Sequence, residues 1–171
     1  LQAQNVAAAR DAVMIEESIQ QAVMEARNLA HGIFPVHVDR NGLSAALTDL
    51  ASMTSRLTGV SIEVKEAAEV YIDGPETAMH LYRIAQEAVV NATKHASAAE
   101  IIISLDVNDE NIVLSVADDG SGLPAEQFRS HGLGLRMMRH RAAVIGARLT
   151  IESPPEGGTM VTCVLPLTAT A

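Results

Sequence analysis

Hydrophobic residues recur with a helical period in the N-terminal part of the chain. Their spacing alternates between four and three, at Ala8, Ala12, Ile15, Ile19, Ala22, Ala26 and Leu29. This spacing is typical of a seam in a helical hairpin or coiled coil, and an amphipathic helix docked on its own domain remains the alternative. The helix should end near Gly32, because Pro35 cannot continue it. We expect residues 1–33 to be a long helix and residues 34–41 a linker.

Beyond the linker, the apolar positions switch between helical and strand periods. Helical spacing covers residues 42–58 and stops at Gly59. Alternation over residues 60–73 predicts one or two short strands. Residues 73–76, Asp-Gly-Pro-Glu, then supply a helix start with proline in the first turn. This second helix includes the stretch RIAQEAVVNATKHA, residues 83–96.

The rest of the chain reads as hairpins around one helix. The predicted elements are strands over 99–107 and 111–119, a glycine-rich segment from Gly120 to Gly134, a helix from Leu135 to about Ile145, and strands over 147–153 and 159–167. Polar turns at 108–111 and 154–158 separate the paired strands. Helices mixed with antiparallel hairpins predict an α+β fold, a two-layer α/β sandwich, over residues 42–171.

Composition limits the partners of this sandwich. Twelve Lys and Arg against 21 Asp and Glu give the 171 residues a net charge of −9, which opposes binding to nucleic acid or to acidic membrane surfaces. The single cysteine, Cys163, cannot form an internal disulfide, so a reduced, cytoplasmic setting fits best. No apolar run is long enough to span a membrane, although a parent protein can still be membrane-anchored. Leu1 in place of Met suggests a piece of a longer chain.

The helix around residues 83–96 has an apolar face and a polar face. The apolar face carries Leu81, Ala85, Ala88 and Ala92, and the polar face carries Arg83, Glu87, Asn91 and Lys94. Polar groups buried without partners cost roughly 1 to 3 kcal/mol, so the polar face should line a wet cleft or hold an ion. Carboxylate and amide oxygens one turn apart suit Mg²⁺, and Lys94 suits phosphate. A solvated face with pairs such as Arg83 and Glu87 is the alternative.

Two acidic residues precede two glycines at the end of the strand over 111–119. A carboxylate at Asp118 can only accept hydrogen bonds, so it suits the exocyclic amine of adenine and repels the oxygen of guanine. Gly120 and Gly122 would let the backbone approach the base. Paired acids before glycine also occur in plain turns, and that alternative stays open.

Two further segments contain glycines beside a predicted element. Gly132 and Gly134 precede a helix, where free N–H groups attract phosphate. The helix that follows is basic, with Arg136, Arg139, His140 and Arg141, which favours a nearby anion as much as a solvated face. Near the C-terminus, a glycine turn precedes Thr159 at a strand start, where Thr is also simply a good strand residue.

These segments, in this order, resemble the catalytic ATP-binding domain of sensor histidine kinases, within the gyrase, Hsp90, histidine kinase and MutL ATPase superfamily. QEAVVNATKH is similar to the N box, DDGSG to the D-x-G-x-G box, GLGL to the second glycine box, and GGT to the closing motif. The match spans about residues 42–166. LAHGIFPVHVDRNGLSAAL and Glu87 resemble the subfamily of nitrate and membrane-fluidity sensor kinases.

The resemblance implies a Bergerat-type ATP-binding fold with ATP and Mg²⁺ as cofactors. It implies that Asn91 coordinates Mg²⁺, with Glu87 as a second metal ligand or a water-activating carboxylate, and that Asp118 recognises adenine. The other implied nucleotide contacts are Gly120 and Gly122 around the base, Gly132, Leu133, Gly134 and Leu135 at the phosphates, Lys94 or His95 near them, and Thr159 behind Asp118. A lid would be drawn from residues 123–131, and residues 1–33 would be the second dimerisation helix of a homodimeric parent.

The chain departs from the family at the phosphoacceptor. The family's acceptor is a His followed by an acidic residue, and none of His31, His37, His80, His95, His131 and His140 fits that pattern. We expect the acceptor upstream of Leu1. The parent would transfer the ATP γ-phosphoryl group to that histidine and then to an aspartate in a response-regulator receiver domain. An anti-sigma-type protein-serine kinase, a clamp ATPase and a nucleotide-dead dimerisation scaffold are the alternatives.

This departure predicts that the chain binds ATP without phosphorylating itself. Incubation with γ-labelled ATP and Mg²⁺ should leave no stable label on the protein, because the expected acceptor is missing. Acid-labile label retained on one of the six histidines would contradict the prediction.

Overall fold

The computed structural model describes most of the predicted sandwich. The described residues are 42–66, 70–72, 74–108, 110–122, 133–155 and 157–167. The chain divides between Pro35 and Val36, and all described residues belong to the second unit. The predicted helix over 1–33 and the linker over 34–41 therefore lie outside the described residues. Within the described part, no helix is long and apolar enough to cross a bilayer.

The helices and strands follow the predicted order. They are α2 (Gly42–Thr58), β1 (Ser61–Glu66), α3 (Pro75–His95), β2 (Glu100–Val107), β3 (Asn111–Asp118), α5 (Leu133–Val144), β4 (Arg148–Glu152) and β5 (Thr159–Pro166). Most boundaries agree closely, but α5 begins at Leu133 rather than Leu135. The stretch over residues 60–73, expected to form one or two strands, contains β1 at Ser61–Glu66, and the described residues 70–72 are not in a strand. Gly134 has a low helix propensity, but burial of Leu135 and Met138 on α5 stabilises a helix that includes it.

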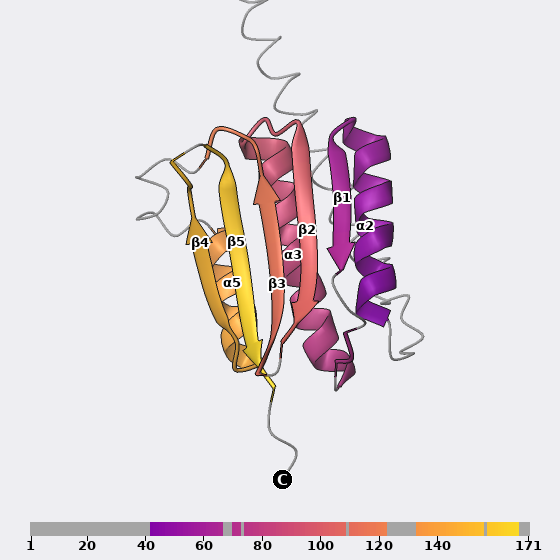
Figure 1. Ribbon diagram of the computed structural model, residues 1–171. Coiled ribbons are helices and arrows are strands. Elements are labelled where there is room, and N and C mark those ends of the chain that lie inside the picture. Colours follow the sequence, from indigo (N-terminus) through magenta and orange to yellow (C-terminus); the bar gives the residue numbers. More distant parts are fainter. Residues whose placement is uncertain are drawn as a thin grey trace, which may run out of the picture. The chain divides into compact units, whose positions relative to one another are not determined.

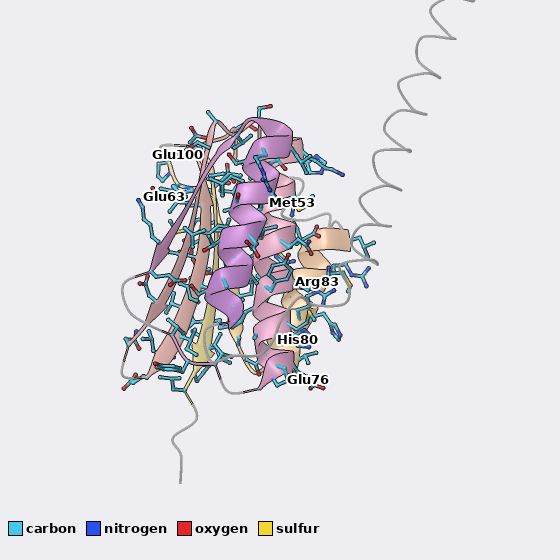
Figure 2. All side chains as sticks on the ribbon, turned by 90° about the vertical axis from the view of Figure 1, so that its right-hand side faces the viewer. Met53, Glu63, Glu76, His80, Arg83 and Glu100 are labelled. Atoms are coloured by element: carbon cyan, nitrogen blue, oxygen red, sulfur yellow. The ribbon has the colours of Figure 1, made fainter. Side chains whose placement is uncertain are left out.

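The strands form one five-stranded sheet in the order β1-β2-β3-β5-β4. β1 pairs with β2 in parallel, and the other neighbours are antiparallel. β5, although later in sequence than β4, lies between β3 and β4. All three described helices lie on one face of the sheet (Figure 1), and the view in Figure 2 shows this helical layer beside the layer of strands. The predicted two-layer α/β sandwich is therefore confirmed.

Local sequence signals set the ends of the helices. Pro75 occupies the first turn of α3, directly after Gly74 with a φ of 89°. Lys94 and His95 lie in its last turn, where positive charge stabilises the carboxyl end of the helix dipole. α2 ends before Gly59, whose φ of 76° is favourable for glycine, and the Gly59 N–H donates to the Ser55 carbonyl at 2.9 Å.

The core lies between the helices and the inner face of the sheet. Fully buried side chains come from α2, α3, α5, β2, β3 and β5, and they are Leu47, Leu81, Ile84, Val89, Ile101, Ile103, Leu105, Leu114, Met138 and Cys163. No polar or charged residue of the described part is fully buried apart from the Cys163 thiol, whose pKa is raised by burial to about 11. The polar groups of any site must therefore lie where the core opens to solvent.

Burial predicts a large difference between two leucines in helices. Leu81→Ala should lower the free energy of unfolding by about 2 to 5 kcal/mol, because the side chain is 0% exposed and its removal leaves a cavity. Leu57→Ala, at a leucine that is 64% exposed, should change it by less than about 0.5 kcal/mol. Urea titration followed by circular dichroism measures both, and equal losses would contradict the described packing.

Candidate functional site

A cavity of about 470 Å³ opens between α3, α5 and the ends of β3 and β5. Its polar lining is Glu87, Asn91, His95, Asp118, Ser121 and Thr159. Its apolar lining includes Val116, Leu135, Met138, Ile151 and Val161. A volume of this size suits a small organic ligand, since such pockets measure roughly 300 to 1,000 Å³. The combination of an apolar floor and a few polar groups is typical of a ligand-binding site.

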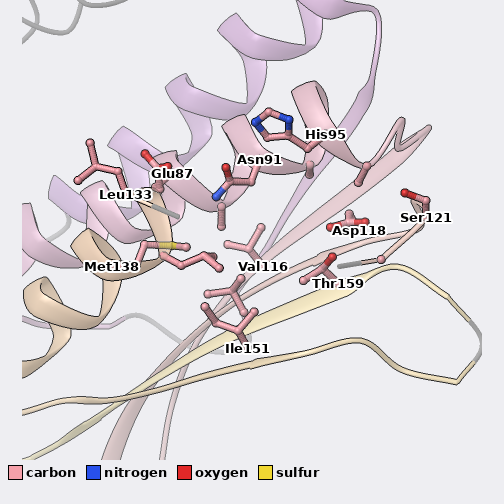
Figure 3. Close-up of a pocket in the computed structure, with 17 residues that line it drawn as sticks. Glu87, Asn91, His95, Val116, Asp118, Ser121, Leu133, Met138, Ile151 and Thr159 are labelled. Atoms are coloured by element: carbon pink, nitrogen blue, oxygen red, sulfur yellow. The ribbon is translucent and has the colours of Figure 1, made fainter. Parts of the chain in front are cut away.

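α3 supplies three polar side chains to the cavity. Glu87, Asn91 and His95 follow at spacings of four, so they lie one above another along one edge of the helix (Figure 3). The neighbouring face of α3 packs into the core through Ala85 and Val89. One helix therefore stabilises the fold with one face and presents carboxylate, amide and imidazole groups with the other.

Strand alternation directs Asp118 into the same cavity. Leu114 and Val116 are buried on the helical face of β3, and Asp118 follows at the next position on that face. Thr159 lies directly opposite Asp118 in the β3–β5 ladder, so its side chain is on the same face. Figure 3 shows Asp118 and Thr159 at one end of the cavity and Glu87 at the other.

A short turn orients the Asp118 carboxylate. The Gly120 N–H donates to Asp118 Oδ1 at 2.9 Å, which is the hydrogen bond of an Asx turn. This bond occupies one carboxylate oxygen. Asp118 Oδ2 is then the acceptor that a ligand can use, because a carboxylate has two oxygens and no donor.

The two loops beside Asp118 pack closely on the end of α3 and on each other. The Ser121 N–H donates to the Ala96 carbonyl at 2.9 Å, and the Gly158 N–H donates to the Gly120 carbonyl at 2.8 Å. A side chain at Gly120 would overlap with the Ala96 carbonyl. At Gly158, with a φ of 77°, a side chain would overlap with the Asp118 carbonyl. These glycines permit backbone contact and are required for the shape of the site.

Asp119 does not line the cavity, and its side chain binds the start of β2. Its Oδ1 accepts hydrogen bonds from the N–H groups of Glu100 at 2.9 Å and Ala99 at 2.8 Å. These bonds, that from Glu100 first, hold the pKa of the Asp119 carboxyl below its usual value of 3.8.

The opposite end of the cavity lies at the N-terminus of α5. Leu133 is 75% exposed there, and a side chain at Gly134 would overlap with the Glu87 carboxylate. The first N–H groups of a helix have no partner within it, so they favour an anion. Farther along α5, burial lowers the pKa of the Arg141 guanidinium, the Arg83 charge lowers it further, and Glu87 opposes both.

The cavity brings together most of the residues expected from the sequence. It is lined by Glu87, Asn91, His95, Asp118, Gly122, Leu133, Gly134, Leu135 and Thr159. Lys94 is exposed and does not line it, because it lies at another angle around α3. Gly120 lies behind the lining, against Ala96. Gly132 and the predicted lid over 123–131 lie outside the described residues.

Several lining residues escaped sequence reasoning. Ser121 stands between the two glycines of DDGSG, and its side chain faces the cavity. Met138 and Ile151 come from α5 and β4 and form part of the apolar floor. Their only signal is apolar periodicity, which does not separate a cavity floor from an ordinary core.

The described lining of the cavity offers too few metal-binding side chains to hold a metal ion alone, but enough to hold one together with a phosphate-bearing ligand. Among the described residues, no group of three or more His, Cys, Asp and Glu side chains could hold a metal. Glu87 and Asn91 offer oxygens one turn apart. Mg²⁺ usually takes one or two protein oxygens and completes its shell with water and substrate phosphate, so this pair suits it.

Comparison with known proteins identifies the family. Residues 76–169 match the family described as histidine kinase-, DNA gyrase B-, and HSP90-like ATPase. The sensor histidine kinase LiaS of Bacillus subtilis is 29% identical over 154 residues, which cover 90% of this chain and 42% of that protein. The oxygen sensor histidine kinase NreB of Staphylococcus carnosus is 30% identical over 155 residues, covering 90% and 45%. The chain thus spans less than half of these relatives.

Solved structures agree with this assignment. The histidine kinase domain of a blue-light activated histidine kinase from Erythrobacter litoralis superposes with a TM-score of 0.62 at 28% identity, covering 74% of this chain and 61% of that chain. The ATP-binding domain of PrrB from Mycobacterium tuberculosis has the same fold, with a TM-score of 0.63 at 22% identity over 73% of this chain and 93% of that chain.

The family match and the fold identify an ATPase-family domain of the type found in histidine kinases, as the sequence resemblance implied. The chain belongs to the family of histidine kinase-, DNA gyrase B-, and HSP90-like ATPases. Its homologues are sensor histidine kinases.

The lowered pKa of Asp119 predicts an acid-dependent loss of stability. A carboxyl with a depressed folded-state pKa contributes stability above its unfolded value, and the contribution is lost as pH falls through the folded pKa. Asp119→Asn keeps an acceptor oxygen but does not titrate. The difference in unfolding free energy between wild type and D119N should be constant above about pH 5 and should shift against wild type below about pH 4. Urea titrations across this range measure it, and a difference independent of pH would contradict it.

Proposed function

We propose that this chain is the catalytic ATP-binding region of a sensor histidine kinase. Its parent transfers the γ-phosphoryl group of ATP to a histidine outside this chain, and then to an aspartate of a response-regulator receiver domain. The family match and the names of the relatives support this proposal. The observation that carries it is the cavity. Asp118, proposed to recognise the base, lines the same cavity as Asn91 and Gly134, which are proposed to lie near the phosphates, although the three residues come from separate elements.

Adenine recognition follows from the orientation of Asp118. Its Oδ1 is engaged by the Gly120 N–H, so Oδ2 accepts a hydrogen bond from the exocyclic amine of the base. A carbonyl at that position, as in guanine or hypoxanthine, would meet an acceptor and be repelled. The flat ring would lie on apolar side chains such as Met138 and Ile151.

The phosphate end follows from α3 and α5. Asn91 and Glu87 are the side chains that would hold Mg²⁺, which when bound neutralises phosphate charge. The N–H groups at the start of α5 donate to phosphate oxygens, and His95 adds a further polar group along α3. Glu87 is also placed to accept a proton from an attacking water where hydrolysis competes with transfer. Lys94, exposed beside this end, would act as a mobile positive charge rather than as a fixed ligand.

Catalysis by such a site is mainly positioning. Phosphoryl transfer requires an aligned acceptor and stabilised charge, and little covalent chemistry from the protein. The acceptor would come from a dimerisation segment, of which residues 1–33 are the part present here, in a homodimeric parent. The alternative of an anti-sigma-type serine kinase has no support among the relatives described, which are sensor histidine kinases.

Nucleotide calorimetry tests the proposal. Wild type should bind ATP with Mg²⁺, and Asp118→Ala should weaken binding roughly tenfold to hundredfold, because a hydrogen bond to a charged group contributes about 1.5 to 3 kcal/mol. Asp49→Ala, at an exposed aspartate on α2, is the matched control and should leave affinity unchanged. No binding by folded wild type would favour a dimerisation scaffold, and unchanged affinity in D118A would remove the base-recognition role.

A further inference from the structure

Asp119 connects the loop after β3 to the start of β2 through three hydrogen bonds, which are together called the clamp. Its Oδ1 accepts from the Ala99 and Glu100 N–H groups at 2.8 and 2.9 Å, and its own N–H donates to the Glu100 carbonyl at 3.3 Å. Asp119 follows the last residue of β3 and, unlike Asp118, does not line the cavity. Two hydrogen bonds to the carboxylate and one from the backbone N–H place Asp119 well to fix a loop.

The clamp joins the loop after β3 to the start of β2. β2 begins at Glu100, and the short connection over residues 96–99 links it to the end of α3, the helix that carries Asn91 and His95. Asp119 lies directly after β3, which carries Asp118. The bonds from Asp119 therefore fix the loop after β3 to the start of β2, through residues that do not line the cavity.

The position of the Asp119 peptide also determines the direction of the Asp118 carboxylate. The Asx turn runs from Asp118 Oδ1 to the Gly120 N–H, so residue 119 is the residue that this turn encloses. If the Asp119 side chain is removed, that peptide keeps its own N–H bond to the Glu100 carbonyl at 3.3 Å but loses the two shorter bonds at 2.8 and 2.9 Å. Its orientation is then less restrained, and the hydrogen bond that holds Oδ1 is weakened with it. Oδ2 then no longer points in one direction.

We propose that Asp119 is a positioning residue that holds the Asp118 carboxylate in the orientation needed to distinguish adenine from a base with a carbonyl at the same position. This inference rests on the proposed function, because it assumes that Asp118 reads the base. Its distinctive consequence is that Asp119 affects the choice between bases and not merely stability.

The same hairpin contains a matched control. Asn108 Oδ1 accepts from the N–H groups of Asn111 at 2.8 Å and Glu110 at 3.1 Å, at the other end of β2 and β3. Asn108→Ala removes these two backbone hydrogen bonds, and a longer one from Asn111 Nδ2 at 3.5 Å, from the turn that joins β2 to β3, at the end of β3 opposite Asp118. It should lower stability without changing base discrimination.

The experiment measures dissociation constants for ATP and inosine triphosphate with Mg²⁺, which differ at the position that Asp118 would read. Four variants are compared with wild type after circular dichroism has verified folding. Asp119→Ala removes the acceptor, Asp119→Asn keeps the acceptor without the charge, Asp119→Glu keeps the charge but displaces the acceptor, and Asn108→Ala is the control.

Wild type should prefer ATP, so the dissociation constant for inosine triphosphate divided by that for ATP should exceed one. D119A should reduce this ratio by about tenfold, because the hydrogen bond from the base to the Asp118 carboxylate is misaligned. D119E should lose discrimination similarly. D119N should stay within about twofold of wild type, and N108A should keep the wild-type ratio, because discrimination follows geometry rather than charge. If D119A fails to fold, the comparison of D119E with D119N gives the same answer.

An unchanged ratio in D119A or D119E would overturn the inference while leaving the ATP site intact. Loss of discrimination in D119N would also overturn it, because charge would then be the cause, and so would an equal loss in N108A. Wild type that binds both nucleotides equally, or neither, would overturn the proposed base recognition itself and the inference with it.

Discussion

The site depends on one backbone contact, between the C-terminal end of α3 and the loop that follows β3. Gly120 lies against Ala96 with no room for a side chain, and the Ser121 N–H donates to the Ala96 carbonyl. Since α3 carries Asn91 and β3 carries Asp118, this contact restrains the position of Asp118 relative to Asn91. The core holds each element in place, but only the glycine lets them approach this closely.

Core and site share the same periodicities, which is why a small domain can contain both. The alternation that buries Leu114 and Val116 continues to Asp118, the last residue of β3, which lines the cavity. On α3 the polar edge through Glu87 and Asn91 adjoins the buried face. A polar residue at the last position of an apolar pattern is therefore exposed enough to remain solvated and close enough to the core to be held rigidly.

Much of this was accessible from the sequence, because helical and strand periods, glycine turns and the proline of α3 are local signals. They predicted each described helix and strand, and they selected Asn91, Asp118 and Thr159, which line one cavity. The parallel pairing of β1 with β2 is a long-range choice that no local pattern encodes. For the same reason the clamp made by Asp119 was missed, since its partners are 19 and 20 positions away.

The position of β5 in the sheet has a consequence for biosynthesis. β5 is the last described strand in sequence, yet it inserts between β3 and β4 and brings Thr159 beside Asp118. During translation, β4 and the free edge of β3 lack their partner in this sheet until β5 emerges from the ribosome. Because Thr159 and Val161 of β5 line the cavity, the cavity is complete only once this last described strand has been synthesised.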